Sequence, residues 1–278
     1  MLFSPPGRLV SRGSGQATAL IHGALSSPSS WHQPLPRRVL AGRTMAYPLP
    51  GHHPWDMSNG QLQRILRIRD LADAYALSLR RDFDHDPVHL VGHSTGAFVA
   101  LAVASRHPAM VSRLTLVGGF ADGTVAGGSP MMKFMLEAGG YTTLALQSLL
   151  RLWTASAVTF RAGLASVMAN QDALTNAEQC HAHWEQVRLD LVHSDFDQIV
   201  EVGRWLGKEK LLGTLTQIRQ PALIIAGTED PVVPFQHQRD IARHMPNGRL
   251  ASFRETGHLP MLEQPRGFCA RVDSSFSR

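Results

Sequence analysis

A serine flanked by two glycines, Gly92-His93-Ser94-Thr95-Gly96, constrains this chain more than any other feature of its sequence. The motif follows an apolar run, Pro87 to Val91, and precedes a run with helical spacing, Phe98 to Arg106. Glycines at such a junction let backbone segments approach where side chains would collide. The pentapeptide alone is a weak signal that also fits an ordinary Gly-Ser loop. Its place between strand and helix predicts a sharp turn that presents Ser94 as a nucleophile.

Strand-like and helix-like segments alternate through the first half of the chain. Apolar runs of strand length are bounded by glycine and proline, and residues 61–81 have the apolar spacing of an amphipathic helix. The strand-like segments are Ala17 to Ile21, Arg43 to Leu49, Val88 to Val91 and Leu114 to Val117. This alternation predicts an α/β fold, with a mostly parallel central sheet flanked by helices on both faces.

The alternation stops near Asp122, and residues 122–213 have an almost wholly helical pattern. The clearest helices there are Met131 to Leu136, Thr143 to Trp153 and Ala177 to Leu191. Strand character returns at Ala222 to Ala226 and Arg249 to Phe253, before a helix from Pro265 onward. We therefore expect an α/β core, residues 1–121 and 214–278, with an inserted all-helical cap, residues 122–213. Met131, Met132, Phe134 and Met135 offer either an adaptable pocket lining or ordinary core of that cap.

Length and composition limit the class of protein. The chain has 278 residues, 44% of them hydrophobic, which is enough for one large buried core. No stretch approaches the ~20 apolar residues that span a bilayer, and Met1 to Val10 lacks the apolar centre of a secretory signal. Cys180 and Cys269 lie far apart without metal-ligand or redox spacing. The simplest interpretation is a cytoplasmic protein without a metal or cofactor; the alternative is a secreted protein whose signal has been removed.

The chain carries a modest excess of positive charge, with 27 basic and 22 acidic residues and a formal net charge of +5. The basic residues are scattered and are not interleaved with aromatic residues, which argues against nucleic-acid binding. The charge suits an anionic substrate or an acidic acyl carrier protein, and equally a solvated surface without a partner.

A serine hydroxyl needs a base to remove its proton, and the base needs a carboxylate to orient it. Such groups are expected on loops at the carboxyl ends of parallel strands. His258 follows the last predicted strand directly after Gly257, and Asp230 follows the strand before it. Pro231 restricts Asp230 to extended backbone, which suits a fixed carboxylate. Glu229 and Asp122 are the competing candidates for the acid.

A tetrahedral intermediate also needs hydrogen-bond donors for its oxyanion. The backbone N–H of Thr95, directly after the serine, is one natural source. The second is expected from the loop after the first strong strand, where Gly23 lets the backbone come close. We choose the N–H of Ala24, with that of Leu25 as the alternative.

Together these residues resemble the α/β-hydrolase superfamily over nearly the whole chain, as a serine esterase-like member with a helical cap. The matching segments are, in order, His22-Gly23, Pro48-Leu49-Pro50-Gly51-His52, Gly92 to Gly96, Gly227 to Pro234 and Gly257-His258. By this resemblance Ser94 is the nucleophile, His258 the general base and acid, and Asp230 the orienting carboxylate. One departure is Tyr47-Pro48-Leu49-Pro50-Gly51-His52-His53, where many relatives carry Asp-Leu-Pro-Gly-His-Gly. We expect it to alter the local turn and pocket rim without touching the triad.

The resemblance implies hydrolysis of a carboxylic ester or thioester through an acyl-enzyme, with a small or medium acyl ester as the first choice. It also makes an acyl carrier protein a candidate partner. A C–C bond hydrolase, a lactonase or an acyltransferase would use the same triad. A cofactor-free haloperoxidase or perhydrolase commonly has methionine where Thr95 stands, and a ligand receptor could retain the triad. The serine argues against the dehalogenase and epoxide-hydrolase branches. The natural substrate and its binding residues stay open at this stage.

Overall fold

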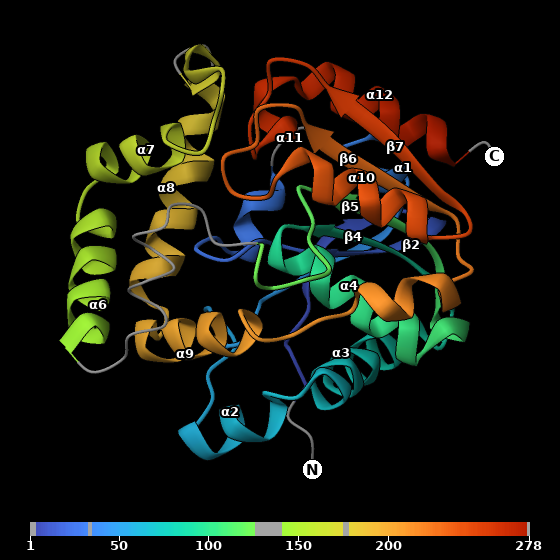
Figure 1. The fold of residues 1–278 in the computed structure, drawn as a ribbon, viewed down its shortest axis with the longest axis horizontal. Helices are drawn as coiled ribbons and strands as arrows, with labels where there is room; N and C mark the ends of the chain where they lie inside the picture. Colours follow the sequence, from blue (N-terminus) through green and yellow to red (C-terminus); the bar gives the residue numbers. More distant parts are fainter. Residues whose placement is uncertain (1–3, 33–34, 126–140, 175–177, 277–278) are drawn as a thin grey trace.

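The computed structural model describes residues 4–32, 35–125, 141–174 and 178–276 (Figure 1). Seven strands form one sheet in the order β1-β3-β2-β4-β5-β6-β7. All neighbouring strands run parallel except β1, which pairs antiparallel with β3. The strands are β1 (Arg8–Arg12), β2 (Gly15–Ile21), β3 (Gly42–Tyr47), β4 (Val88–His93), β5 (Val111–Val117), β6 (Ala222–Gly227) and β7 (Gly248–Phe253). The predicted mostly parallel sheet is confirmed, and the antiparallel edge strand β1 was not predicted.

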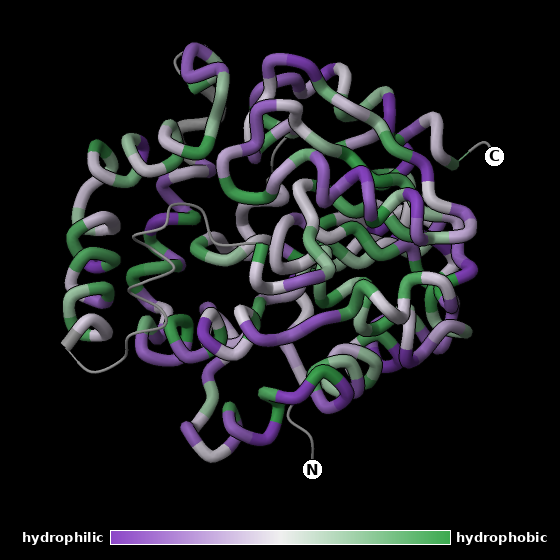
Figure 2. The backbone as a smooth tube through the Cα atoms, viewed as in Figure 1, coloured by the Kyte–Doolittle hydropathy of each residue, from purple (hydrophilic) through white to green (hydrophobic). Residues whose placement is uncertain are grey.

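Helices cover both faces of this sheet, because side chains alternate between the faces along each strand. Ala19 and Ile21 of β2 pack into one apolar core, whereas Leu20 packs into the other. The helices that cover the first face are α2 (Asn59–Ile65), α3 (Ile68–Phe83), α4 (Thr95–Arg106) and α10 (Phe235–His244). Those on the second face are α1 (Arg37–Leu40) and α12 (Pro265–Ser275). Figure 2 shows hydrophobic and hydrophilic residues alternating along α3, as an amphipathic surface helix requires.

The single helix predicted over residues 61–81 is wrong, because the chain forms two helices there. Helix α2 ends at Ile65 and α3 begins at Ile68, and Arg67 between them has extended backbone dihedrals, φ −143° and ψ 136°. Ser58 begins α2 with a capping box, in which its hydroxyl accepts from the Gln61 N–H and the Gln61 side chain accepts from the Ser58 N–H. The apolar spacing is continuous through this region and therefore gives no sign that one helix ends and another begins.

Between β5 and β6 the described residues form four α-helices, which we call the helical block. They are α6 (Tyr141–Thr154), α7 (Ala157–Ala165), α8 (Glu178–Val192) and α9 (Phe196–Leu206), with a short 3₁₀ helix at Gln171–Leu174. Figure 1 shows them gathered beside the sheet rather than in its helical layers. Two of the helices predicted individually correspond to α6 and α8, whereas α7 and α9 fall in the stretch predicted as almost wholly helical but were not singled out. The predicted helix Met131 to Leu136, with Met131, Met132, Phe134 and Met135, lies outside the described residues.

The helical block contacts the sheet part of the molecule where its loops leave the carboxyl ends of the strands. One apolar cluster joins residues of α7 and α8 to Leu259 and Leu262, which follow β7. A second joins residues of α6 and α9 to the partly buried Leu25, which follows β2. At the base of the block, the Gly123 N–H donates to the Glu209 carbonyl over 2.9 Å. No helix in the described ranges is long and apolar enough to cross a membrane.

Candidate active site

Ser94 lies at the sharp turn between β4 and α4, with φ 51° and ψ −115°. A positive φ is unusual for serine and costs about 1–3 kcal/mol, so the surrounding structure must enforce it. Both flanking glycines are required by close approach. A Cβ at Gly92 would lie 2.3 Å from the Gly96 carbonyl oxygen, and one at Gly96 would lie 2.2 Å from the Ile21 carbonyl oxygen. The turn predicted from the pentapeptide is therefore present.

His258 and Asp230 form a buried hydrogen-bonded pair. The Nδ1–H of His258 donates to Oδ2 of Asp230 over 2.9 Å, and the Asp230 side chain is 0% exposed. His258 follows β7 and Asp230 follows β6, so adjacent parallel strands bring the two loops together. Because the carboxylate can only accept, the bond places the proton on Nδ1 and leaves Nε2 with a lone pair.

The same carboxylate also accepts hydrogen bonds from its own loop. The N–H groups of Val232 and Val233 donate to Oδ1 over 2.8 and 2.9 Å. Burial by itself would raise the pKa of the Asp230 carboxyl, but the contact with His258 and the two N–H donors outweigh it and lower the pKa. Asp230 is therefore an anion where its imidazole partner needs one.

The competing acids lie elsewhere. Asp122 accepts from the Thr124 hydroxyl and forms an ion pair with Lys210 at 3.5 Å. Glu229 is exposed to solvent. Of the three candidates, Asp230 is the one that hydrogen-bonds to His258.

Ser94 and His258 both lie against the carboxyl end of β5. The Ser94 N–H donates to the Val117 carbonyl over 2.8 Å. A Cβ added to the next residue, Gly118, would lie 3.0 Å from Nδ1 and Cε1 of His258. Within the described residues the Ser94 hydroxyl makes no hydrogen bond, to His258 or to any other group. The structure thus joins His258 to Asp230 directly and places Ser94 beside the same strand end. Hydrogen bonds between catalytic groups are often long or poorly aligned before substrate binds.

The loop after β2 approaches Ser94 closely. A Cβ at Gly23 would lie 3.1 Å from the Cβ of Ser94 and 2.7 Å from Nδ1 of His93. His22 orients this loop: its Nε2 accepts from the Leu49 N–H over 3.1 Å, so its Nδ1 donates to the Gly23 carbonyl over 2.7 Å. Burial, with His52 and His93 nearby, holds the pKa of His22 well below its usual value. The neutral ring required by these two bonds is thus favoured.

The turn that departs from the usual sequence of relatives faces the helical block. The Gly51 carbonyl accepts from the Asp195 N–H over 3.0 Å, and Gly51 has φ +76°. The His53 N–H donates to the Ser194 hydroxyl over 2.9 Å. Pro48 stands where many relatives carry the acidic residue, and Tyr47 before it is buried and donates its phenol O–H to Asp82. This segment is therefore part of the junction between the sheet and the block.

Comparison with known proteins agrees with this geometry. The model of a family described as "Alpha/beta hydrolase family" matches residues 19–272. The chain belongs to the alpha/beta hydrolase family. It is 26% identical over 273 residues to a 2-hydroxymuconate semialdehyde hydrolase of Pseudomonas putida, covering 95% of this chain and 88% of the relative. It is 27% identical over 272 residues to a pimeloyl-[acyl-carrier protein] methyl ester esterase of Aromatoleum aromaticum, covering 91% and 95%.

Among solved structures, an enol-lactonase from Burkholderia xenovorans LB400 superposes with a TM-score of 0.74 at 18% identity, covering 99% of this chain and 96% of the other. This likeness shows the fold shared by the alpha/beta hydrolase family. The family resemblance inferred from the five motifs is confirmed, and the named sequence relatives are hydrolases.

Two polar residues near the site of this alpha/beta hydrolase were not predicted. His93, inside the pentapeptide, donates its Nε2–H to the His258 carbonyl over 3.0 Å. Burial and the neighbouring His258 lower the pKa of His93 to about 3, so this ring is neutral. Glu263, five residues after His258, is a buried carboxylate bonded to backbone N–H groups. A glutamate inside an apolar segment was the signal that could have singled it out.

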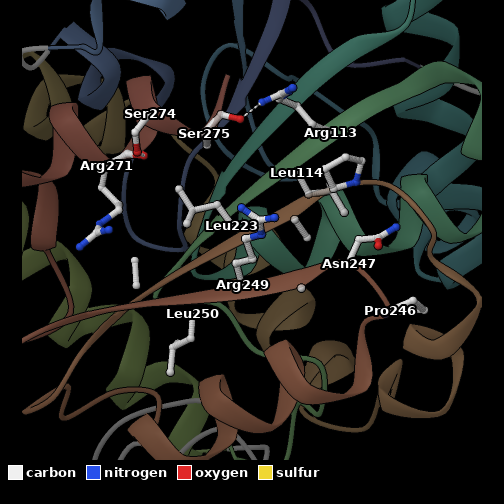
Figure 3. Close-up of a pocket in the computed structure, with 14 residues that line it drawn as sticks. Arg113, Leu114, Leu223, Pro246, Asn247, Arg249, Leu250, Arg271, Ser274 and Ser275 are labelled. Atoms are coloured by element: carbon white, nitrogen blue, oxygen red, sulfur yellow. Dashed lines mark hydrogen bonds between the residues drawn. The ribbon is translucent and has the colours of Figure 1, made fainter. Parts of the chain in front are cut away.

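A cavity of about 620 Å³ opens away from Ser94, among residues at the amino ends of β5, β6 and β7. Its lining includes Arg113, Arg249 and Arg271, and Figure 3 shows these guanidinium groups spread along it rather than meeting at one point. Arg113 donates to the Ser275 carbonyl. Since family chemistry takes place at the carboxyl ends of the strands, this cavity is not the site of Ser94. In the described ranges, no three His, Cys, Asp or Glu side chains are grouped to hold a metal ion.

Proposed function

We propose that this protein is a serine hydrolase that cleaves a carboxylic ester or thioester through a Ser94-His258-Asp230 triad. The observation that carries the proposal is the buried Nδ1–H to carboxylate bond of His258 and Asp230, next to a serine with positive φ. A neutral imidazole with a lone pair on Nε2 is the base that a serine hydroxyl requires.

In the proposed reaction, Ser94 Oγ attacks the carbonyl carbon while His258 Nε2 takes the hydroxyl proton. The tetrahedral intermediate collapses and expels the alkoxide or thiolate, which leaves as alcohol or thiol with the proton from His258. Water then adds to the acyl-enzyme, giving its proton to Nε2, and the acid leaves as Ser94 recovers the proton. Asp230 stabilises the imidazolium in each half-reaction without becoming protonated.

The oxyanion would be bound by the backbone N–H groups of Thr95 and Ala24. Thr95 begins α4, so its N–H lies at the positive end of the helix. Leu25, the alternative donor, has φ 54°, which shows that the loop after Gly23 turns sharply beside Ser94. Losing one such donor typically costs about 3 kcal/mol of transition-state stabilisation.

The helical block is the proposed cap, and we assign residues 122–213 to it and residues 1–121 and 214–278 to the hydrolase core. The apolar contacts to Leu25 and Leu259 support a cap above the site, because both residues flank proposed catalytic groups. An acyl carrier protein is a candidate partner, supported by the esterase of Aromatoleum aromaticum and by the net charge of +5.

Cleavage of a C–C bond is the second candidate function, favoured by the relative from Pseudomonas putida, because the substrate in its name, 2-hydroxymuconate semialdehyde, has no ester bond to hydrolyse. Purified protein would be assayed with p-nitrophenyl esters, acyl thioesters and lactones of graded acyl length, and with 2-hydroxymuconate semialdehyde. Higher kcat/KM for an ester or thioester supports the first proposal. Higher kcat/KM for the semialdehyde would instead support C–C bond cleavage by the same triad.

Replacement of the nucleophile tests the triad itself. Ser94→Ala should reduce turnover of the best substrate by at least about 10⁴-fold, because the variant lacks the hydroxyl on which the proposed acyl-enzyme forms. A fluorophosphonate probe should label the wild type at Ser94 and leave the variant unlabelled. Ser274→Ala, an exposed serine on α12, is the matched control and should keep both turnover and labelling. Full turnover by Ser94→Ala, or labelling at another serine, would refute the assignment.

A further inference from the structure

Glu263 is a buried carboxylate at the end of the short helix α11 (Pro260–Glu263), 6% exposed. Its oxygens accept hydrogen bonds from four backbone N–H groups in two separate segments. The distances are 3.0 Å from Gly257, 3.3 Å from Leu259, 2.9 Å from Ala169 and 2.9 Å from Asn170. A carboxylate that collects this many donors away from water has a specific positional role, because an ionised group is costly to bury without such partners.

The first two donors lie on either side of His258. The Gly257 and Leu259 N–H groups both point to Glu263, while the His258 N–H donates to the Val167 carbonyl over 2.8 Å. The His258 carbonyl accepts from the Nε2–H of His93. The N–H groups of residues 257–259 and the His258 carbonyl are therefore all hydrogen-bonded, and Glu263 accepts from two of these groups.

The other two donors belong to the helical block. Ala169 and Asn170 follow α7, and the same stretch supplies the Val167 carbonyl that accepts from His258. The contact is close: a Cβ at Gly257 would lie 2.6 Å from the Val167 oxygen and 2.7 Å from the Ala169 nitrogen. Glu263 thus joins the loop of the histidine to one short segment of the block.

We propose that Glu263 is a positioning residue that acts through the backbone of residues 257–259 and makes the orientation of the His258 imidazole depend on the contact with residues 167–170. The inference builds on the proposed function of His258. Catalytic side chains must be held within about 0.5 Å of the productive geometry, and a 1 Å displacement can cost about 10²-fold in rate. A glutamine cannot replace the carboxylate, since its NH₂ group would face backbone N–H donors that need acceptors.

The test compares Glu263→Gln with Glu255→Gln, a matched control in the same loop whose side chain is exposed. Using the best ester from the substrate panel, we expect Glu263→Gln to lower kcat by about 10- to 100-fold with less than about a 3-fold change in KM. Fluorophosphonate labelling of Ser94, measured per folded molecule, should slow by a similar factor. Glu255→Gln should match the wild type in both measurements.

Amide hydrogen exchange gives a readout independent of activity. Peptides that cover residues 256–260 and those that cover residues 167–171 should both exchange faster in Glu263→Gln, and neither should change in Glu255→Gln. If either segment of Glu263→Gln exchanged as slowly as in the wild type, the proposed link between the two segments through Glu263 would be contradicted.

A double-mutant cycle separates positioning from general destabilisation. In a His258→Ala background the slow residual labelling of Ser94 should not fall further when Glu263→Gln is added, because both changes remove the same function. An equally large loss of labelling rate in that background, or wild-type kcat in Glu263→Gln, would overturn the proposal.

If Glu263→Gln does not fold, Glu263→Asp is measured in the same way. Aspartate keeps the charge but is one methylene too short to reach both segments, and it should still lower kcat. A wild type that neither turns over esters nor is labelled would instead refute the proposed function.

Discussion

At the scale of single residues, the two oxygens of the Asp230 carboxylate have different partners. Oδ1 accepts from the N–H groups of Val232 and Val233, and Oδ2 accepts from Nδ1 of His258 and from the Gln238 side chain. The loop therefore fixes which oxygen faces the imidazole. An asparagine at this position would keep its carbonyl on the loop N–H groups and turn its NH₂ toward His258.

That orientation predicts a large effect of Asp230→Asn. The NH₂ group would donate to Nδ1, move the imidazole proton to Nε2 and remove the base from Ser94, so turnover should fall by roughly 10³- to 10⁴-fold. Asp122→Asn and Glu229→Gln should each change turnover by less than about 5-fold, because their carboxylates contact other groups or solvent. Steady-state kinetics on the three purified variants is the measurement. A larger loss of turnover in Asp122→Asn than in Asp230→Asn would assign the role of the orienting carboxylate to Asp122 instead.

At the scale of elements, the helical block and the sheet part are joined by two buried carboxylates, one from each side. Glu263, in the sheet part, accepts hydrogen bonds from N–H groups of the block. Asp190, on α8 of the block, accepts hydrogen bonds from the sheet part. Asp190 is 6% exposed and takes hydrogen bonds from the hydroxyls of Ser27 and Ser29 over 2.8 and 2.5 Å. Both serines follow the Gly23 loop. The block therefore contacts the segments on both sides of the proposed site.

Removal of Asp190 should weaken this junction measurably. Asp190→Ala leaves two fully buried hydroxyls without their acceptor, and each unsatisfied group costs about 1–3 kcal/mol. We expect a loss of about 2–4 kcal/mol in the free energy of unfolding, measured by urea denaturation. Asp197→Ala, at an exposed position on the neighbouring helix α9, should cost less than about 1 kcal/mol. Equal losses in the two variants would show that the buried contacts add nothing.

At the scale of the whole molecule, four histidines other than His258 are buried in the described part of the chain: His22, His52, His89 and His93. Burial lowers the pKa of His22 well below its usual value, that of His52 to about 4, and those of His89 and His93 to about 3. In an unfolded chain each of these groups would titrate near pH 6.5. The folded protein therefore keeps four neutral imidazoles over a pH range in which the unfolded chain binds protons to them.

Stability should consequently fall as the medium is acidified. Since the folded pKa values are lowered, the contribution of these groups to stability is complete above about pH 6.5 and is lost as pH falls toward about 4 for His52 and about 3 for His89 and His93. Near pH 5, unfolding should take up about four protons, one at each of these imidazoles, measured from the pH dependence of urea denaturation between pH 5 and 7. His89→Gln should reduce this uptake by about one proton. A free energy of unfolding that stays constant over this range would contradict the assigned neutral state.

The parts that sequence predicted well are those that local pattern controls. The turn at Ser94 was predicted because two glycines and a strand-to-helix change leave few other conformations. The strands β4, β5 and β6 were predicted because buried parallel strands appear as short apolar runs. The break between α2 and α3 was missed, since apolar spacing continues through Leu66 and carries no information about a backbone that turns extended there.

The sequence by itself determined the fold class, the sharp turn at Ser94 and the chain order of Ser94, Asp230 and His258. These depend on backbone sterics and on apolar periodicity, which act between near neighbours in the chain. Only the tertiary structure decided which acid meets His258, that His93 and Glu263 bind the backbone around it, and that Asp190 joins the block to the Gly23 loop. These contacts join residues up to 165 positions apart, and no local pattern specifies which buried polar groups will meet once the elements pack.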